Sequence, residues 1–354
     1  MADVCAVPEQ LTGVEEKLLT FTKVVNEKIK IDQTPREVIW TLNKTRLIRY
    51  QPVLPASQRH KVPLLLVFAL MNRPSILDLR PENSYVHYML HQGYDLYLLD
   101  WGIPGPEDKD LKFDDYVLDY LTRAIRKLKS FAGVEEFSML GWCIGAILST
   151  CYAALRPDDG LRNLILLTAP LDYSNPDMTF AKWIKEPNFN VDLVLETFGN
   201  MPGQMMDAGA RILKPVENYL GNYLRLWDNL DKPAAVQAWQ AMNTWVNDNI
   251  PMAGGAFRQL VTDLYRNDRL IKAEWHLRGE RVDPANIKAN LLTVIAEADH
   301  ITPPCMSKTI IDRVGSKDKT LHYIHGGHIG IMVGSSANRV TWPYMNDWLA
   351  ARSE

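Results

Sequence analysis

The chain has 354 residues, 47% of them hydrophobic and 23% charged, and a formal net charge of −3 at pH 7. This composition is typical of a globular protein with one large domain, or one domain with a sizeable insertion. The small net charge argues against nucleic acid as a partner. No stretch approaches the roughly 18 apolar residues of a transmembrane segment, and the N-terminus lacks the basic start and apolar run of a signal peptide.

The cysteines are dispersed along the chain and form neither a CxxC pair nor a zinc-binding spacing. They are Cys5, Cys143, Cys151 and Cys305. We therefore expect reduced thiols, as in a cytosolic protein, and no metal site.

Near the N-terminus, residues 14–30 carry apolar side chains at helical spacing. They are Val14, Leu18, Phe21, Val25 and Ile29. This pattern predicts one face of an amphipathic helix. The helix either packs on its own domain or binds a partner.

From residue 61 the pattern alternates between apolar strands and helices. A helix is expected over 113–130, and another follows Leu140 and runs through Ala154. Alternating strands and helices predict an α/β protein with a doubly wound, mainly parallel sheet. The expected strands are Pro63–Leu70, Tyr94–Leu99, Glu136–Leu140, Leu164–Thr168, Leu291–Ala296 and Thr320–Ile324.

The alternation stops between 172 and 285, where helical stretches rich in Trp and Met predominate without strand signals of comparable quality. We interpret this part as a helical cap inserted into the sheet domain. Its tryptophans and methionines form either the cap's own small core or the apolar inner face of a mobile lid.

The strongest candidate for a catalytic motif is Gly141-Trp142-Cys143-Ile144-Gly145, which lies between an expected strand and an expected helix. This context suits a nucleophile elbow, in which the nucleophile occupies a sharp turn and glycines allow strand and helix to pass closely. The helix N-terminus would favour the thiolate of Cys143. The backbone N–H groups of Ile144 and Met71 are the expected oxyanion donors. In the alternative interpretation, Cys143 is only a small buried apolar residue.

A triad also needs an acid and a base, in the chain order nucleophile, acid, base. Asp299 follows the strand that ends at Ala296, and His328 follows the last strand, within Gly326-Gly327-His328. We predict Asp299 as the acid and His328 as the base. His325 and His300 remain alternative bases, and Glu297 and Asp172 alternative acids.

Most enzymes with this elbow use serine as the nucleophile, so a cysteine at this position helps to indicate the type of substrate and reaction. Transfer of an acyl group from a thioester to a thiol is nearly balanced in energy and keeps the acyl group activated for a second transfer. Cys143 therefore favours thioester substrates and acyl transfer. A capped pocket that excludes water would have the same effect.

Taken together, the motifs resemble a polyhydroxyalkanoate synthase, an enzyme of the α/β-hydrolase superfamily. The similarity runs over about residues 34–352, and the short N-terminal part resembles the two-subunit synthases of class III or IV. One departure is that Ile144 and Ala146 stand where many of these enzymes have glutamine and glycine. The motifs that carry the resemblance are the cysteine elbow, Asn72-Arg73-Pro74, Asp78-Leu79, Asp100-Trp101-Gly102, Asn200-Met201-Pro202-Gly203, Ala298-Asp299-His300 and Gly326-Gly327-His328-Ile329-Gly330.

The pattern along the chain divides it into three parts: an N-terminal helix and first strand region (1–60), a sheet core that the resemblance identifies as an α/β-hydrolase core (61–171 and 286–354), and the cap (172–285). The resemblance implies polymerisation of short-chain (R)-3-hydroxyacyl-coenzyme A through an acyl-cysteine, with the thioester as substrate and no cofactor. It further implies a cytoplasmic homodimer with a small accessory subunit, attached to polymer granules. The competing hypotheses are a dienelactone hydrolase-like enzyme or thioesterase, an acyltransferase that makes a small ester, and an inactive scaffold protein.

Overall fold

The computed structural model describes residues 9–175, 178–186 and 189–354, so Cys5 lies outside the described residues. Its centre is an eight-stranded sheet in the order β1-β2-β6-β3-β7-β8-β11-β12. The first two pairings are antiparallel and the other five are parallel, which confirms the mainly parallel sheet. The strands are β1 (Arg36–Leu42), β2 (Thr45–Tyr50), β3 (Leu64–Val67), β6 (Leu96–Asp100), β7 (Phe137–Trp142), β8 (Leu161–Leu167), β11 (Asn290–Ala296) and β12 (Lys319–Ile324).

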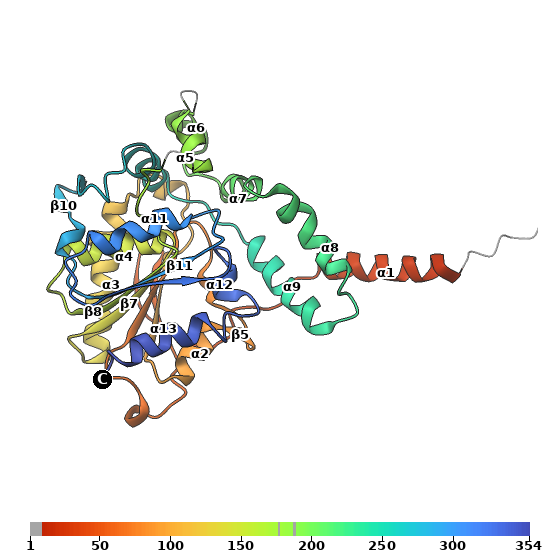
Figure 1. Ribbon diagram of the computed structural model, residues 1–354, viewed down its shortest axis with the longest axis horizontal. Helices are drawn as coiled ribbons and strands as arrows, with labels where there is room; N and C mark the ends of the chain where they lie inside the picture. Colours follow the sequence, from red (N-terminus) through yellow and green to blue (C-terminus); the bar gives the residue numbers. More distant parts are fainter. Residues whose placement is uncertain (1–8, 176–177, 187–188) are drawn as a thin grey trace, which may run out of the picture.

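Helices cover both faces of this sheet. Figure 1 shows α3, α4 and α11 on one face and α2 and α13 on the other. A strand between two helical layers buries both of its faces, which explains the continuous apolar run of β3 and the complete burial of β7. The helices of the sheet domain are α2 (Tyr85–His91), α3 (Thr122–Ala132), α4 (Ile144–Leu155), α11 (Pro304–Lys308), α12 (Gly330–Val333) and α13 (Thr341–Ala350).

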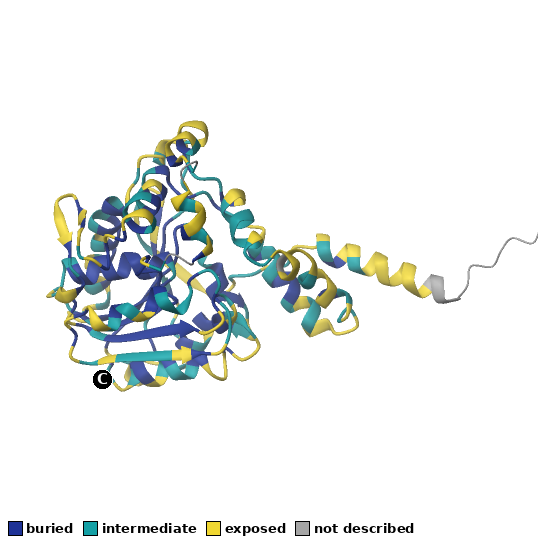
Figure 2. Cartoon of the chain, turned by 45° about the horizontal axis from the view of Figure 1, so that its top comes forward, coloured by how far each residue is buried: buried dark blue, intermediate teal, exposed yellow. Residues whose placement is uncertain are grey.

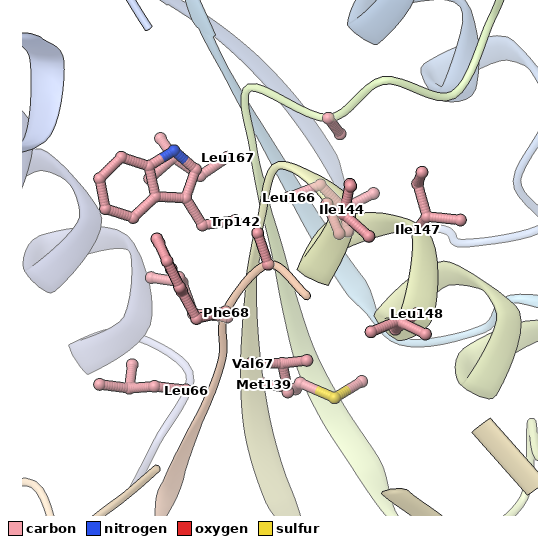
Figure 3. Packing of buried hydrophobic residues seen from close by; sticks show 14 of the residues in the cluster. Leu66, Val67, Phe68, Met139, Trp142, Ile144, Ile147, Leu148, Leu166 and Leu167 are labelled. Carbon is pink, nitrogen blue, oxygen red and sulfur yellow. The ribbon is translucent and has the colours of Figure 1, made fainter. Parts of the chain in front are cut away.

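The central strands and α4 share one apolar core, which supports the carboxyl end of β7. Figure 3 shows Phe68 beside Trp142 on one side of the strands, and Ile144, Ile147 and Leu148 of α4 on the other. The rings of Phe68 and Trp142 meet edge to face at 5.2 Å. The turn between β7 and α4 is therefore held by packing on both sides.

The expected helix over 113–130 forms as a π-helical segment, Asp115–Leu121, that continues into α3. A two-stranded hairpin, β4 (Asp78–Arg80) and β5 (Asn83–Ser84), lies between β3 and α2.

Between β8 and β11 the chain is mainly helical. One difference from the sequence prediction is a short antiparallel hairpin, β9 (Trp275–Leu277) and β10 (Glu280–Val282). Three-residue strands are too short to give a period-two pattern, so this hairpin left no clear sequence signal. The helical elements are α5 (Thr179–Lys185), α6 (Val191–Phe198), α7 (Gly203–Ile212), a π-helical segment (Val216–Gly221), α8 (Asn222–Trp227), α9 (Pro233–Val246), α10 (Gly254–Gln259) and a second π-helical segment (Leu260–Arg266).

The N-terminal helix α1 (Glu9–Asn26) projects from the sheet domain beside α8 and α9 (Figure 1). A second, small apolar core joins these three helices, with Val24, Leu226 and Trp239 at its centre. Much of α1 beyond this contact is exposed (Figure 2), including Val14 and Leu18.

The helix ends at Asn26, earlier than the expected residue 30. Beyond it the chain turns toward the sheet domain, where Ile29 packs against the main core and Thr34 donates to Asp78 Oδ1 at 2.8 Å. Tertiary contacts thus override the local helical pattern.

Candidate active site

Cys143 lies in the turn between β7 and α4, with φ 56° and ψ −122°. Such a conformation is rare for a residue with a side chain and is retained where the surroundings fix it. The backbone N–H of Cys143 donates to Leu167 O at 3.0 Å, and its carbonyl accepts from Ala146 N at 2.9 Å. Cys143 itself is half-buried.

The two glycines of the motif are required by close packing. A Cβ atom on Gly145 would lie 2.1 Å from Val67 O, and one on Gly141 would lie 2.6 Å from Ser149 Oγ. The strand and helix therefore pass at a distance that only glycine permits. This is the local geometry that the pentapeptide predicts.

Asp299 and His328 meet at the carboxyl edge of the sheet. Asp299 lies after β11 and His328 after β12, and His328 Nδ1 is 2.7 Å from Asp299 Oδ2 in a buried contact. The other carboxylate oxygen of Asp299 accepts from the backbone N–H groups of Ile301 at 2.9 Å and Thr302 at 2.8 Å. These bonds fix the carboxylate and orient the imidazole ring.

Electrostatics connect His328 to Cys143. Burial alone would lower the pKa of His328, but the charges of Asp299 and Cys143, with hydrogen bonds to both, outweigh it and raise the pKa well above its ordinary value. The imidazole thus interacts with the carboxylate and with the sulfur. The structure brings together the three residues that the sequence singled out, in an arrangement that can take a proton from a thiol.

The alternative residues lie in other surroundings. His325 is an exposed side chain whose Nδ1 lies 3.3 Å from Glu297 Oε2, so these two pair with each other. Asp172 is buried and accepts from the N–H of Ser174 at 2.9 Å. His300 is half-buried, and both its burial and the charge of Lys214 lower its pKa.

The two expected oxyanion donors lie on different segments. Ile144 is the first residue of α4, where backbone N–H groups lack an acceptor within the helix. Met71 is half-buried in the loop after β3 and packs against the main core. Their roles stay predictions.

Within the ranges that the structure describes, no three His, Cys, Asp or Glu side chains cluster as metal ligands would. The described helices also include none with the length and apolarity needed to span a membrane.

Sequence reasoning missed two tyrosines near this site. Tyr173 follows β8 and Tyr265 lies in the second π-helical segment, and the charge of Cys143 acts on both. Tyr173 could have been noticed because it follows a strand end, next to Asp172. Tyr265 sits in a helical stretch and gives no comparable signal.

Comparison with known proteins assigns the chain to a family. A sequence profile of the α/β hydrolase fold matches residues 81–335, and one described as the N-terminus of poly-beta-hydroxybutyrate polymerase (PhaC) matches residues 17–89. The chain is 34% identical to the poly(3-hydroxyalkanoate) polymerase subunit PhaC of Allochromatium vinosum, over 92% of this chain and 91% of that protein. It belongs to the poly(3-hydroxyalkanoate) polymerase family.

Other members of the poly(3-hydroxyalkanoate) polymerase family are similar to this chain to about the same degree. The subunit PhaC of Haloferax mediterranei is 36% identical over 92% of this chain, which spans 66% of that longer protein. The subunit PhaC of Synechocystis is 31% identical, over 92% of this chain and 87% of that protein. The resemblance inferred from the motifs is confirmed.

Solved structures confirm the fold of this polymerase-family chain. A monoglyceride lipase from Saccharomyces cerevisiae has a TM-score of 0.62 at 15% identity and covers 92% of this chain, which covers 98% of that one. An esterase from Thermogutta terrifontis has a TM-score of 0.52 at 14% identity, with 90% and 99% covered. At these identities the likeness concerns the α/β-hydrolase fold alone.

Proposed function

We propose that this chain is an acyltransferase that polymerises short-chain (R)-3-hydroxyacyl-coenzyme A, such as 3-hydroxybutyryl-coenzyme A, and releases coenzyme A. The observation that carries the proposal is the arrangement of Cys143, His328 and Asp299 at the elbow of a chain from the poly(3-hydroxyalkanoate) polymerase family. The thioester is the substrate, and the proposed reaction uses no cofactor.

In the first step His328 takes the proton of Cys143, and the thiolate attacks the carbonyl carbon of the thioester. The carbonyl oxygen becomes an oxyanion, which the N–H groups of Ile144 and Met71 would stabilise. The bond from carbon to the coenzyme A sulfur then breaks, and His328 returns the proton to the departing thiol. The acyl group remains on Cys143.

In the second step the 3-hydroxyl of another acyl group attacks the acyl-cysteine. His328 takes the hydroxyl proton, an ester bond forms, and the bond between the carbonyl carbon and Cys143 Sγ breaks. The proton then passes from His328 to the departing sulfur of Cys143, which restores the thiol. Asp299 would stabilise the charged imidazole in both steps, and the raised pKa of His328 beside this carboxylate supports that role. Each cycle lengthens the polyester by one unit.

The relatives' names support a proposal about assembly. Several are called subunits of a polymerase. We propose that this chain acts as the catalytic subunit of a synthase, as a homodimer with a small accessory subunit, in the cytoplasm at the surface of polymer granules. The growing polyester is then both product and partner, and nucleic acid is not a partner.

The test is incubation of the purified chain with (R)-3-hydroxybutyryl-coenzyme A, following free thiol and insoluble product together. We expect thiol release with insoluble polyester in the wild type, and neither product in Cys143→Ala. A matched control is Cys151→Ala, because Cys151 is fully buried in α4 and its thiol pKa is raised, first by burial. Thiol release with only soluble 3-hydroxybutyrate would indicate a hydrolase and would contradict the proposal.

A further inference from the structure

Two tyrosine rings pack together beside the nucleophile. Tyr173 lies in the loop after β8, the strand whose last residue, Leu167, accepts the backbone N–H of Cys143. Tyr265 comes from the π-helical segment Leu260–Arg266. The ring centroids of the two tyrosines are 4.5 Å apart with an interplanar angle of 62°. The first residues of the cap, in the loop after β8, and its later part therefore meet through this pair.

The hydroxyl group of Tyr173 is buried and has no hydrogen-bond partner among the described residues. A buried hydroxyl without a partner is unfavourable, and native proteins keep few of them without a reason. One such reason is a ligand that supplies the partner when it binds.

Both phenols lie within electrostatic range of the Cys143 sulfur. Burial is the largest cause that raises the pKa of each phenol, and the charge of Cys143 raises both further. The two phenols are therefore protonated at neutral pH and available as hydrogen-bond donors near Cys143.

The loop of Tyr173 is also tied to the segment that follows Tyr265. The backbone N–H of Tyr173 donates to Asp268 Oδ1 at 2.8 Å. Asp268 is itself buried and adopts a positive φ of 55°, a conformation that few residues with side chains take. This bond helps to hold the loop of Tyr173 against the segment that carries Tyr265.

We propose that the Tyr173–Tyr265 pair binds the oxygen atom on carbon 3 of the acyl group and so selects 3-hydroxyacyl over plain acyl thioesters. This inference rests on the proposed function. Backbone N–H groups serve the carbonyl oxygen of the thioester, which leaves the oxygen on carbon 3 as the other polar atom of a short acyl chain. That oxygen is an alcohol in the monomer and an ester oxygen in the chain, and a phenol can donate to both.

The experiment compares acylation by 3-hydroxybutyryl-coenzyme A and by butyryl-coenzyme A, which lacks the hydroxyl group. Coenzyme A release in a single turnover and the mass of the acylated protein are measured for the wild type, Tyr173→Phe and Tyr265→Phe. A site that hydrogen-bonds a substrate hydroxyl discriminates strongly against the analogue without it. We expect each variant to lose on the order of 10- to 100-fold in the single-turnover rate of coenzyme A release with the hydroxylated substrate, with little change for the butyryl one.

The matched control is Tyr85→Phe. Tyr85 is equally buried and its hydroxyl also lacks a partner among the described residues, but it lies on α2 against Trp342. We expect this variant to leave both substrates unaffected.

If the tyrosine variants slow both substrates by the same factor, or leave their ratio unchanged, the pair is structural and the inference is wrong. Failure of the proposed function is visible separately, because the wild type itself would then form no polyester from 3-hydroxybutyryl-coenzyme A.

Discussion

Asp299 Oδ2 and His328 Nδ1 are 2.7 Å apart, with 0% and 5% of their side chains exposed. Breaking such a buried pair by removing one charge is unfavourable because the other charge stays uncompensated. The folded-state pKa of His328 is raised above its unfolded value. The stability that follows from this shift is present in full below the unfolded pKa and is lost as pH rises through the folded pKa.

Replacing Asp299 by asparagine removes the negative charge of the side chain and keeps nearly the same shape. In Asp299→Asn the remaining carbonyl oxygen can still accept from Ile301 and Thr302, while the negative charge is lost. We expect the free energy of unfolding to fall by on the order of 3 kcal/mol at about pH 6. The difference from the wild type should shrink as pH rises through the folded-state pKa of His328. Urea denaturation across a pH series measures it, and a pH-independent difference would contradict the assigned charge interaction.

The base can be tested with two neighbouring histidines. His328→Ala should slow coenzyme A release by on the order of 10²- to 10⁴-fold, because neither the thiol nor the attacking hydroxyl then has an acceptor for its proton. His325→Ala is the matched control, since the His325 side chain is 93% exposed and pairs with Glu297. Normal rates in His328→Ala, with loss in His325→Ala, would reassign the base.

Replacing glycine by alanine should change the stability of the protein in opposite directions at Gly145, in the elbow, and at Gly209, outside it. Alanine is normally preferred over glycine within a helix by about 1 kcal/mol, so Gly209→Ala in α7, where the nearest atom is 3.6 Å away, should stabilise the protein. Gly145→Ala should instead destabilise it by about 3 kcal/mol or more, because its Cβ meets the backbone oxygen of Val67. Thermal unfolding of the two variants measures this, and equal shifts would contradict the close approach at the elbow.

The elbow and the candidate triad residues could be predicted from the sequence because their signals are local, whereas contacts between distant segments could not. Gly141 and Gly145 mark a close approach that no other residue tolerates, and Asp299 and His328 each follow a strand whose carboxyl end faces the site. Such signals are local. The Tyr173–Tyr265 contact joins two distant segments, and nothing in either segment specifies the other.

The difference between local signals and long-range contacts also explains why α1 ends earlier than its sequence pattern predicts. The apolar spacing of α1 continues through Ile29, yet the helix ends at Asn26. Ile29 belongs to a second apolar surface, the main core, and periodicity cannot show which of two cores a side chain joins.

The small core between α1 and the cap can be tested at Trp239. This side chain is 9% exposed and centres the cluster with Val24 and Leu226. Trp239→Ala should remove about 3 kcal/mol of local packing and release α1, leaving the sheet domain folded. Hydrogen exchange over residues 13–26 should then rise relative to β7.

A control lies on the same cap. Trp183 is 40% exposed on α5, so Trp183→Ala should leave the exchange of α1 unchanged. If Trp239→Ala also left it unchanged, α1 would be held by contacts other than this core.

The tryptophans and methionines of the cap do not behave as one group. Trp245 and Trp275 are buried, as is Met252, whereas Met205 is 43% exposed. The later part of the cap shares the main core through Ala256, Val261 and Leu264, whereas many side chains of α6, α7 and α8 are exposed.

A lid must open at low free energy, so its amides should exchange faster than those of the strands around it. We expect rapid exchange over residues 191–227 and slow exchange over 254–266, which the main core holds, with β7 and β8 slowest. Binding of a non-transferable acyl-coenzyme A analogue should alter protection in the first of these segments and leave β8 unchanged. Hydrogen exchange with mass spectrometry, with and without the analogue, measures both effects. Exchange over residues 191–227 as slow as in β7, and unaltered by the analogue, would contradict a mobile lid and favour a cap that serves only as a packed layer.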